Sequence, residues 1–424
     1  MSISKRNMEL GYITFSSEEQ QLVHDVLQQI NQNQGAIDEL GLGRIRDAFS
    51  DLMFPGMSTL HRKSKYFVLL PALYNQLAQT TITDRKQISS LIRQWEINMT
   101  ISLLNGNAPD KHIGITGSSK DIDKLRKNDF VKIRPTHIYL SSLKFFGLVD
   151  NKMNLEDLIY QQSQMKATSK IRRTKERGEE DTDDINNPIG FAPNFFPFSG
   201  YDFSKESAIS LQLTANEAQI LREQIIKKCR ESNKGKDNLY SYILNDKDKN
   251  IKIVPNFFDM SVIIKGFPEE LSKVYKMAYD FSKWAHLMNT YYRYAFYSKM
   301  NPDDAQAKTN KANHKANIDK IKKDGDYPQK ARLEEILDFI SPEFTDVNGL
   351  TKFCIVASNH LEKNQEDELI GLIIKRERDI KRDHYKIGNV RYKNTNFSDP
   401  PGYYTYRWNE IVYSMIDDIR KAQL

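Results

Sequence analysis

The amino-acid sequence predicts a mainly α-helical protein with an N-terminal helical domain, a small winged-helix-like module and a C-terminal helical domain with one long helix. Apolar residues recur at three- and four-residue steps along most of the chain, a spacing typical of helices packed on one face. Glycine, proline and polar breaks separate these stretches. The chain has 424 residues, of which 39% are hydrophobic, so we expect more than one core.

The N-terminal helical domain is expected over residues 1–110. A helix capped near Ser16 carries an evenly spaced apolar face. A second helix or turn ends at the Phe-Pro-Gly sequence of residues 54–56, because proline and glycine stop helices. The apolar run 66–77 predicts a buried helix, and another helix begins near Asp84.

The winged-helix-like module is expected over residues 111–165, followed by a charged linker over 166–190. Thr136 is a candidate cap and Gly147 closes the helix that follows it. The ending LKFFGLVD is similar to the last helix of a winged-helix module running into its wing. In the linker, a block of basic residues precedes a block of acidic ones, and such blocks repel themselves and bury little.

The C-terminal helical domain is expected over residues 191–424. Thr214 and Glu217 have the spacing of a capping box. A very long helix spans about 269–300, and polar, lysine-rich sequence follows to about Asp326. Further helices are expected near residues 329–340, 346–363, 365–383 and 406–422.

The cysteine content and the hydropathy favour a cytoplasmic protein. The two cysteines, Cys229 and Cys354, have no metal-ligand spacing, so neither a disulfide framework nor a structural zinc site is expected. No apolar run is long enough to cross a membrane. We therefore expect a reducing cytoplasm and no membrane partner.

Sequences that resemble catalytic or ligand-binding motifs lack essential residues. In the loop 114–120 the glycines are too close together for a phosphate-binding P-loop. The pair His384 and Lys386 is similar to half of a phospholipase-D-type motif, but Arg391 stands where the aspartate is required. The acidic loop 246–250 has Ile251 in place of the turn glycine of a calcium site. We therefore assign no catalytic residue and expect neither a cofactor nor a metal site.

Basic clusters are the strongest functional signal, since the net charge of +6 is small for this length. The first comprises Arg44, Arg46, Arg62, Lys63 and Lys65. There the amides of a glycine turn and the guanidinium groups of the following helix could share one phosphate. The alternative is a simple glycine turn with solvated charges, in which Arg46 pairs with a neighbouring aspartate.

Two further basic clusters occur later in the chain. One frames the winged-helix-like segment and the other lies within residues 375–393, where tyrosines are interleaved. Aromatic side chains beside Lys and Arg suit stacking on bases with charge on the backbone. A solvated helix face is the alternative for each cluster. The candidate nucleic-acid-binding residues are Lys132, Arg134, Lys144, Arg376, Arg378, Lys381, Arg382, Tyr385 and Lys386.

Tyrosines at the end of the long helix cover more than one helical face. Tyr291, Tyr294 and Tyr297 are candidates for a partner-protein interface. Contacts within the core and between subdomains are the alternative.

The run GLGRIRDAFSDLMFPGMST from Gly41 to Thr59, followed by KYFVLLP, resembles the N-terminal signature of an uncharacterised bacterial family of unknown function. The resemblance continues through IYLSSLKFFGL and the closing YRWNEIV, and so spans nearly the whole chain. Leu140 and Phe146 stand where relatives are expected to have tryptophan, which indicates a divergent member. The resemblance implies a place in anti-phage defence neighbourhoods beside helicases and phospholipase-D-like nucleases, with no established activity.

Together these observations favour an accessory subunit of an anti-phage defence system. It would bind nucleic acid, with DNA favoured, through the basic clusters and dock a helicase or nuclease. One alternative is a pure protein-interaction scaffold. Another is an atypical metal-dependent nuclease using the dispersed carboxylates Glu334, Glu335, Asp367 and Glu368.

Overall fold

The computed structural model describes residues 38–108, 112–115, 122–127, 133–176, 194–246, 250–300 and 304–423. Within these ranges the protein is mainly helical and has no β-strand, which confirms the predicted helical class. The helix predicted from Ser16 lies outside the described residues. None of the described helices combines the length and apolarity needed to cross a lipid bilayer.

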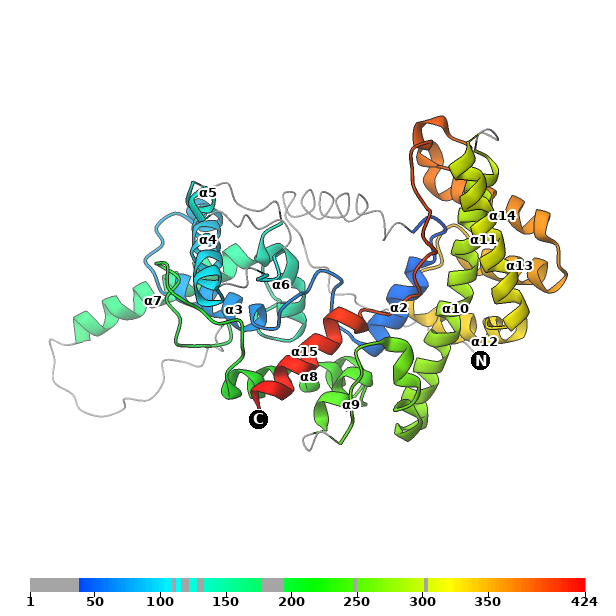
Figure 1. Cartoon of the computed structure of the whole chain (residues 1–424). Helices are drawn as coiled ribbons and strands as arrows, with labels where there is room; N and C mark the ends of the chain where they lie inside the picture. The colour runs from blue at the N-terminus through cyan, green and yellow to red at the C-terminus, as the bar shows by residue number, and fades with distance from the viewer. Residues whose placement is uncertain are drawn as a thin grey trace, which may run out of the picture.

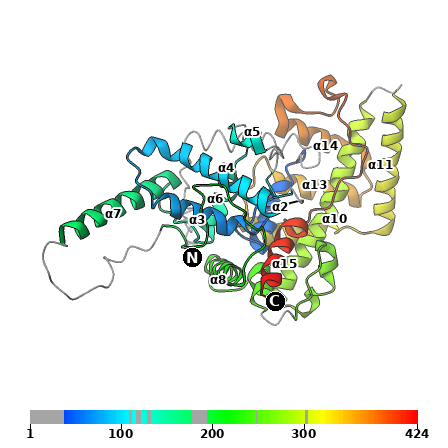
Figure 2. The ribbon, with the colours of Figure 1, turned by 60° about the vertical axis from the view of Figure 1, so that its left-hand side comes forward.

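A first group of helices packs around α3, which is buried along almost its whole length. Nearly every residue of α3 is apolar, so neighbours can cover it on all sides, and α4, α6 and α7 do so. Figure 1 shows this group on the left, and Figure 2 also shows α7 extending away from it. The group comprises α3 (Tyr66–Leu77), α4 (Ile88–Gly106), α5 (Ile122–Arg126), α6 (Pro135–Phe145) and α7 (Leu155–Glu176).

A second group joins α8 (Ala215–Ser232), α9 (Leu239–Asn245) and the last helix, α15 (Tyr413–Ala422). The predicted capping box at the start of α8 is confirmed. The Thr214 hydroxyl accepts from the Glu217 amide at 3.3 Å, and the Glu217 carboxylate accepts from the Thr214 amide at 2.8 Å. α8 packs against both α9 and α15, so the end of the chain lies on a helix formed about 200 residues earlier.

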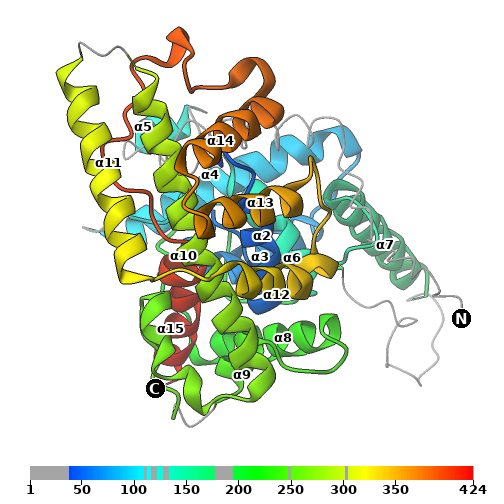
Figure 3. The ribbon, with the colours of Figure 1, turned by 90° about the vertical axis from the view of Figure 1, so that its right-hand side faces the viewer.

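The third group is built on the long helix, which extends from Glu269 to Ser298 as α10 and confirms the prediction. α10 packs against α11 and α14, and Figure 3 shows this group from the front. The polar sequence that follows α10 forms a helix, α11, which was not predicted. The other members are α11 (Ala305–Asp324), α12 (Lys330–Ile340), α13 (Leu350–Glu362) and α14 (Glu366–Lys381).

Helix α2 (Gly43–Met53) lies between the groups and packs against α10 and α12. Its Phe49 ring is 6.1 Å from the Phe281 ring of α10. Figure 1 shows α2 in blue beside the green α10. A segment assigned by sequence to the N-terminal domain therefore packs on the helix at the centre of the predicted C-terminal domain.

The winged-helix-like module is not confirmed in the described part of residues 111–165. Gly147, just after the end of α6, has a positive φ of 69° and closes the helix as predicted, but no wing of paired strands follows it there. A single antiparallel bridge links Val149 to Phe195 instead. The predicted charged linker begins as helix, because α7 continues to Glu176, and residues 177–193 lie outside the described part.

The segment 397–407 runs between α2 and α10 before the chain enters α15. Tyr406 and Arg407 have positive φ values of 51° and 65°, a region that non-glycine residues seldom adopt. They are followed by a π-helical turn, Trp408–Val412. Tyr406 packs its ring on Phe49, and the buried Trp408 donates to the Val254 carbonyl oxygen at 2.8 Å. These contacts hold an unusual backbone in place.

Candidate nucleic-acid interface and an arginine-lined cavity

The first predicted basic cluster separates into exposed and buried side chains. Arg44 is exposed on α2 and has no ion pair in the described part of the chain. Arg46 donates two hydrogen bonds to the Asp47 carboxylate, at 3.0 and 3.1 Å, which is the pairing with a neighbouring aspartate given above as the alternative. Arg62 pairs with Glu410 at 3.3 Å in a solvent-exposed contact. Lys65 is buried and bonds Glu217 at 2.6 Å, so it holds α3 to α8 and presents no accessible charge.

The glycine turn before α2 differs from the anion site that the sequence suggested. The amide of Gly43 donates to the Asp38 carboxylate at 2.8 Å. An acidic side chain of the protein therefore occupies the position expected for a phosphate. Lys63 is half-buried, and its backbone amide donates to the Tyr139 hydroxyl at 3.3 Å. The arginines of α2 and the basic residues of the segment 62–65 therefore do not form a single phosphate site.

The second predicted cluster is mostly internal. Lys132 lies outside the described residues. Arg134 is half-buried, 3.8 Å from the buried carboxylate of Glu96. Lys144 is buried and donates to the Met153 carbonyl oxygen at 2.9 Å. Since Lys144 packs inside the fold, it has no surface on which to meet a polyanion.

The third predicted cluster also contains buried members. Arg376 donates to the carbonyl oxygens of Leu40, at 3.1 Å, and Asn348. Lys386 bonds the Glu39 carboxylate at 2.5 Å, and Lys381 lies 3.6 Å from the same carboxylate. These side chains join α14 and the loop after it to the segment before α2.

The remaining cations of this region are exposed and gather at one end of the molecule. Lys299, at the end of α10, lies against Gly388 and so beside the loop after α14. Lys375 pairs with Asp379 at 2.6 Å, whereas the five cations named below have no ion pair with a carboxylate in the part of the chain that the structure describes. Figures 1 and 3 show the loop in orange at the top, at the same end as the tops of α10 and α11. We call this surface the basic tip; it comprises Lys299, Arg378, Arg382, Arg391 and Lys393.

Aromatic rings lie within the basic tip. Tyr385 is half-buried, with the Arg378 guanidinium 5.3 Å from its ring centre. Tyr392, also half-buried, follows Arg391 directly. Val390 beside it is 78% exposed. The basic tip therefore offers charge and ring surface together, a combination suited to a nucleic-acid strand.

The predicted partner tyrosines are used inside the protein. Tyr291 and Tyr297 are buried, and the Tyr297 hydroxyl accepts from the amide of Phe397 at 2.8 Å. Tyr294 is half-buried under Lys311 of α11. The alternative of contacts between subdomains accounts for these rings.

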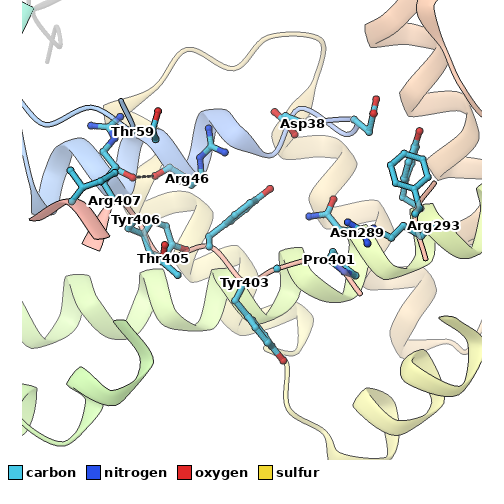
Figure 4. A pocket seen from close by; sticks show the side chains of 17 residues that line it. Asp38, Arg46, Thr59, Asn289, Arg293, Pro401, Tyr403, Thr405, Tyr406 and Arg407 are labelled. Atoms are coloured by element: carbon cyan, nitrogen blue, oxygen red, sulfur yellow. Dashed lines mark hydrogen bonds between the residues drawn. The ribbon is translucent and has the colours of Figure 1, made fainter. Parts of the chain in front are cut away.

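A cavity of about 290 Å³ lies between α2, α10 and the segment 397–407. Figure 4 shows Arg407 and Thr59 at one end, Arg46 in the middle, and Asn289 and Arg293 at the other end. Asp38 enters from the segment before α2. Its complete lining is Asp38, Glu39, Arg46, Ser50, Thr59, Asn289, Tyr292, Arg293, Phe397, Pro401, Gly402, Tyr403, Tyr404, Thr405, Tyr406, Arg407 and Ile411.

The arginines of this cavity have different partners. Arg407 pairs with Asp51 at 2.5 Å and donates to the Met57 carbonyl oxygen at 2.6 Å. Arg293 donates to the carbonyl oxygen of Asp399 and lies 5.5 Å from the centre of the Phe397 ring. Burial lowers the pKa of Arg293, against the opposing effects of Tyr297 and of the Asp399 carboxylate. Arg293 therefore places a positive charge at its end of the cavity, with no carboxylate at ion-pair distance among the described residues.

The two carboxyl groups of the cavity have raised pKa values. Burial raises the pKa of Asp38, against the opposing effects of the Gly43 amide and the Arg46 charge. Burial likewise raises the pKa of Glu39, although Lys386 acts to lower it. Sequence reasoning missed this site, because its walls come from segments about 350 residues apart. The sequence singled out one lining residue, Arg46, and a further signal was Arg293, an arginine within a run of tyrosines.

The dispersed carboxylates are not assembled into a metal centre. Among the described residues, no group of three or more His, Cys, Asp or Glu side chains is arranged to hold a metal ion. Glu334 lies 3.7 Å from Lys330, and Glu335 bonds Arg332 at 2.7 Å. Glu334 and Glu335 therefore form contacts with basic side chains of their own helix, α12.

Comparison with known proteins gives one match. The model of a family of unknown function (DUF6361) matches residues 8–137, which include α2, α3 and α4. No curated protein and no solved structure matches the chain. Over residues 8–137 the chain is thus similar to an uncharacterised family, in agreement with the resemblance drawn from the run between Gly41 and Thr59.

Proposed function

We propose that this protein is a nucleic-acid-binding accessory subunit and that it contacts nucleic acid through the basic tip. The observation that carries the proposal is the gathering of exposed cations without ion pairs at the end of α10 and in the loop after α14. Each phosphate that a Lys or Arg neutralises releases a condensed counterion, so such a surface favours a polyanion without needing a deep groove.

The aromatic rings of the basic tip make a strand with accessible bases a suitable ligand. A half-buried ring such as Tyr385 or Tyr392 is held by its neighbours and can still offer a face to a base. The cations beside it then contact the backbone. We therefore expect single-stranded DNA to bind at least as tightly as duplex DNA of equal length.

We further propose that the protein works within an anti-phage defence system beside a helicase or a nuclease. Support for this part comes from the family resemblance, which associates the family with anti-phage defence neighbourhoods but implies no mechanism. Since Tyr291 and Tyr297 are buried, a docking surface for that enzyme has to use other residues.

A titration of the purified chain with labelled single-stranded and duplex DNA tests the proposal. Fluorescence anisotropy would be measured at salt concentrations between about 50 and 200 mM, the range over which phosphate contacts weaken strongly. We expect binding at low salt and a steep loss of affinity as salt rises. Failure to bind either DNA at the lowest salt would remove the proposal.

A protein-interaction scaffold is the second candidate, and a specific observation favours it. Lys65, Lys144, Arg376 and Lys386, all predicted to bind nucleic acid, are internal side chains with partners in the fold. If the remaining exposed cations are only solvated, the same titration shows no DNA affinity. Co-purification with a helicase or nuclease would then support the scaffold.

A further inference from the structure

We propose that the cavity between α2, α10 and the segment 397–407 binds a nucleoside phosphate. This inference does not depend on the basic tip, since none of the residues of the tip lines the cavity. It rests on the charge distribution, the unpartnered polar atoms, the ring surface and the size of the cavity.

The Arg293 end of the cavity is suited to the phosphate. Its guanidinium has one hydrogen bond in the described structure, to the carbonyl oxygen of Asp399, whereas the group carries five N–H donors. The Asn289 side chain, one helical turn earlier on α10, lies beside it (Figure 4). Guanidinium groups bind phosphate oxygens in a forked geometry, and Asn289 can add a further donor.

Buried polar atoms in the lining lack a partner. The Arg407 Nε atom is buried and has no hydrogen-bond partner among the described residues, and the buried Glu39 Oε2 atom has only the Lys381 ammonium 3.6 Å away, beyond hydrogen-bond distance. Such atoms are rare in folded proteins because each costs free energy unless a water or ligand satisfies it. Together with Asp38, the Glu39 carboxyl group offers acceptors for the hydroxyl or amino groups of a nucleoside.

The cavity also provides a surface for a planar ring. Tyr404 is partly exposed, and the guanidinium of Arg46 lies 5.5 Å from its ring centre. Aromatic rings and guanidinium planes both stack on nucleobases. A volume of about 290 Å³ is near the lower end of ligand pockets, roughly 300 to 1,000 Å³, and suits a single nucleotide better than a longer strand.

The backbone at Arg407 strengthens the case. The consecutive positive φ values at Tyr406 and Arg407, followed by the π-helical turn, bring Arg407 to the cavity wall. Unusual backbone conformations and π-helical turns cost free energy, yet they occur often at binding sites, where they fix the direction of a side chain.

Isothermal titration calorimetry of the full chain tests the proposal. The probes are the four 5′-nucleoside monophosphates, the matching nucleosides and inorganic phosphate. We expect at least one monophosphate to bind about tenfold more tightly than its nucleoside and than inorganic phosphate. Only the monophosphate contacts both the Arg293 end and the part of the cavity that accepts the nucleoside. The proposal is overturned if no monophosphate binds better than inorganic phosphate.

Variants locate the binding. Arg293→Gln should weaken monophosphate binding by about tenfold or more, the effect of losing a charged hydrogen bond. Arg44→Gln removes an exposed arginine from α2 outside the cavity and should leave binding unchanged. If Arg293→Gln does not fold, Arg293→Lys keeps the charge without the fork and should weaken binding several-fold. Binding that is insensitive to the Arg293 variant that folds contradicts the proposal.

The nucleotide could be free or the end of a strand, and one comparison separates the two sources. A short oligonucleotide with a 5′-phosphate and one with a 5′-hydroxyl are titrated into wild type and Arg293→Gln. An Arg293-dependent preference for the phosphorylated strand identifies a strand end, and equal weak binding of both with tight monophosphate binding identifies a free nucleotide. Cavity variants should retain duplex binding, so loss of one function does not imply loss of the other.

Discussion

At the scale of single residues, cations that look alike in the sequence have opposite roles. Arg44 and Lys65 belong to one predicted cluster, yet Arg44 is exposed and Lys65 is buried against Glu217. The sequence could show that basic residues gather. It could not show which ones find a carboxylate, because Glu217 lies 152 residues beyond Lys65.

Replacing Lys65 by methionine should destabilise the protein strongly. The substitution leaves the Glu217 carboxylate buried without its cation, and removing one partner of a buried pair costs about 3–5 kcal/mol. Urea unfolding followed by circular dichroism measures the change. Arg44→Met, an exposed control from the same cluster, should change the free energy of unfolding by about 0.5 kcal/mol or less. Equal effects of both variants would show that the Lys65 pair is misassigned.

His61 should make stability depend on pH. Burial lowers its pKa from 6.5 to about 3, and the neutral ring accepts from the Ser58 amide at 3.2 Å and lies 3.1 Å from the Ser142 hydroxyl. The unfolded chain therefore takes up the proton first, so stability that is complete above pH 6.5 is lost as the pH falls towards 3. Between pH 7 and 5 this loss is about 2 kcal/mol. In His61→Gln the drop measured by urea unfolding should be smaller by that amount; an unchanged drop would contradict the buried neutral state.

At the scale of helices, apolar periodicity and caps predicted most elements. The long helix predicted over 269–300 is found from Glu269 to Ser298. α11 was missed, because its buried face is formed by small and polar residues such as Asn310 and His314. The buried His314 ring forms a hydrogen bond with the Phe397 carbonyl oxygen at 2.7 Å, and Phe397 lies 83 residues further along the chain. Periodicity could not reveal a helix stabilised by such partners.

The start of α6 shows how a local signal can be misread. Thr136 was expected to cap the helix, but Pro135 already occupies its first turn and the preceding Arg134 makes no side-chain cap bond. The Thr136 hydroxyl instead bonds the Tyr74 hydroxyl of α3 at 2.7 Å. Proline is favoured in the first helical turn, so Pro135 predicts the start of α6 better than Thr136 does.

Replacing Thr214 by alanine should destabilise α8 by about 1 kcal/mol. The variant loses the side-chain bond to the Glu217 amide, and losing an N-cap of this type costs roughly 0.5–2 kcal/mol. Ser232→Ala, at the exposed end of the same helix, should have an effect below about 0.5 kcal/mol. Chemical unfolding measures both, and a Thr214→Ala protein as stable as the control would rule out the cap.

At the scale of the whole molecule, long-range packing determines where the functional surfaces lie. Lys299 joins the basic tip only because α10 ends beside the loop after α14. The cavity likewise needs Asp38, Arg293 and Arg407, which no local pattern connects. Residues 375–393, which the sequence singled out as a basic cluster, contain Arg378 and Arg382, and both side chains are exposed.

The most direct test of the account compares the DNA affinity of two charge-matched triple variants. One replaces Arg382, Arg391 and Lys393 of the basic tip by glutamine, and the other replaces the exposed Lys252, Lys265 and Lys276. We predict that only the tip variant loses affinity, with the slope of log affinity against log salt reduced by about 2 to 3 through the lost phosphate contacts. Equal affinities and slopes for the two variants would contradict it.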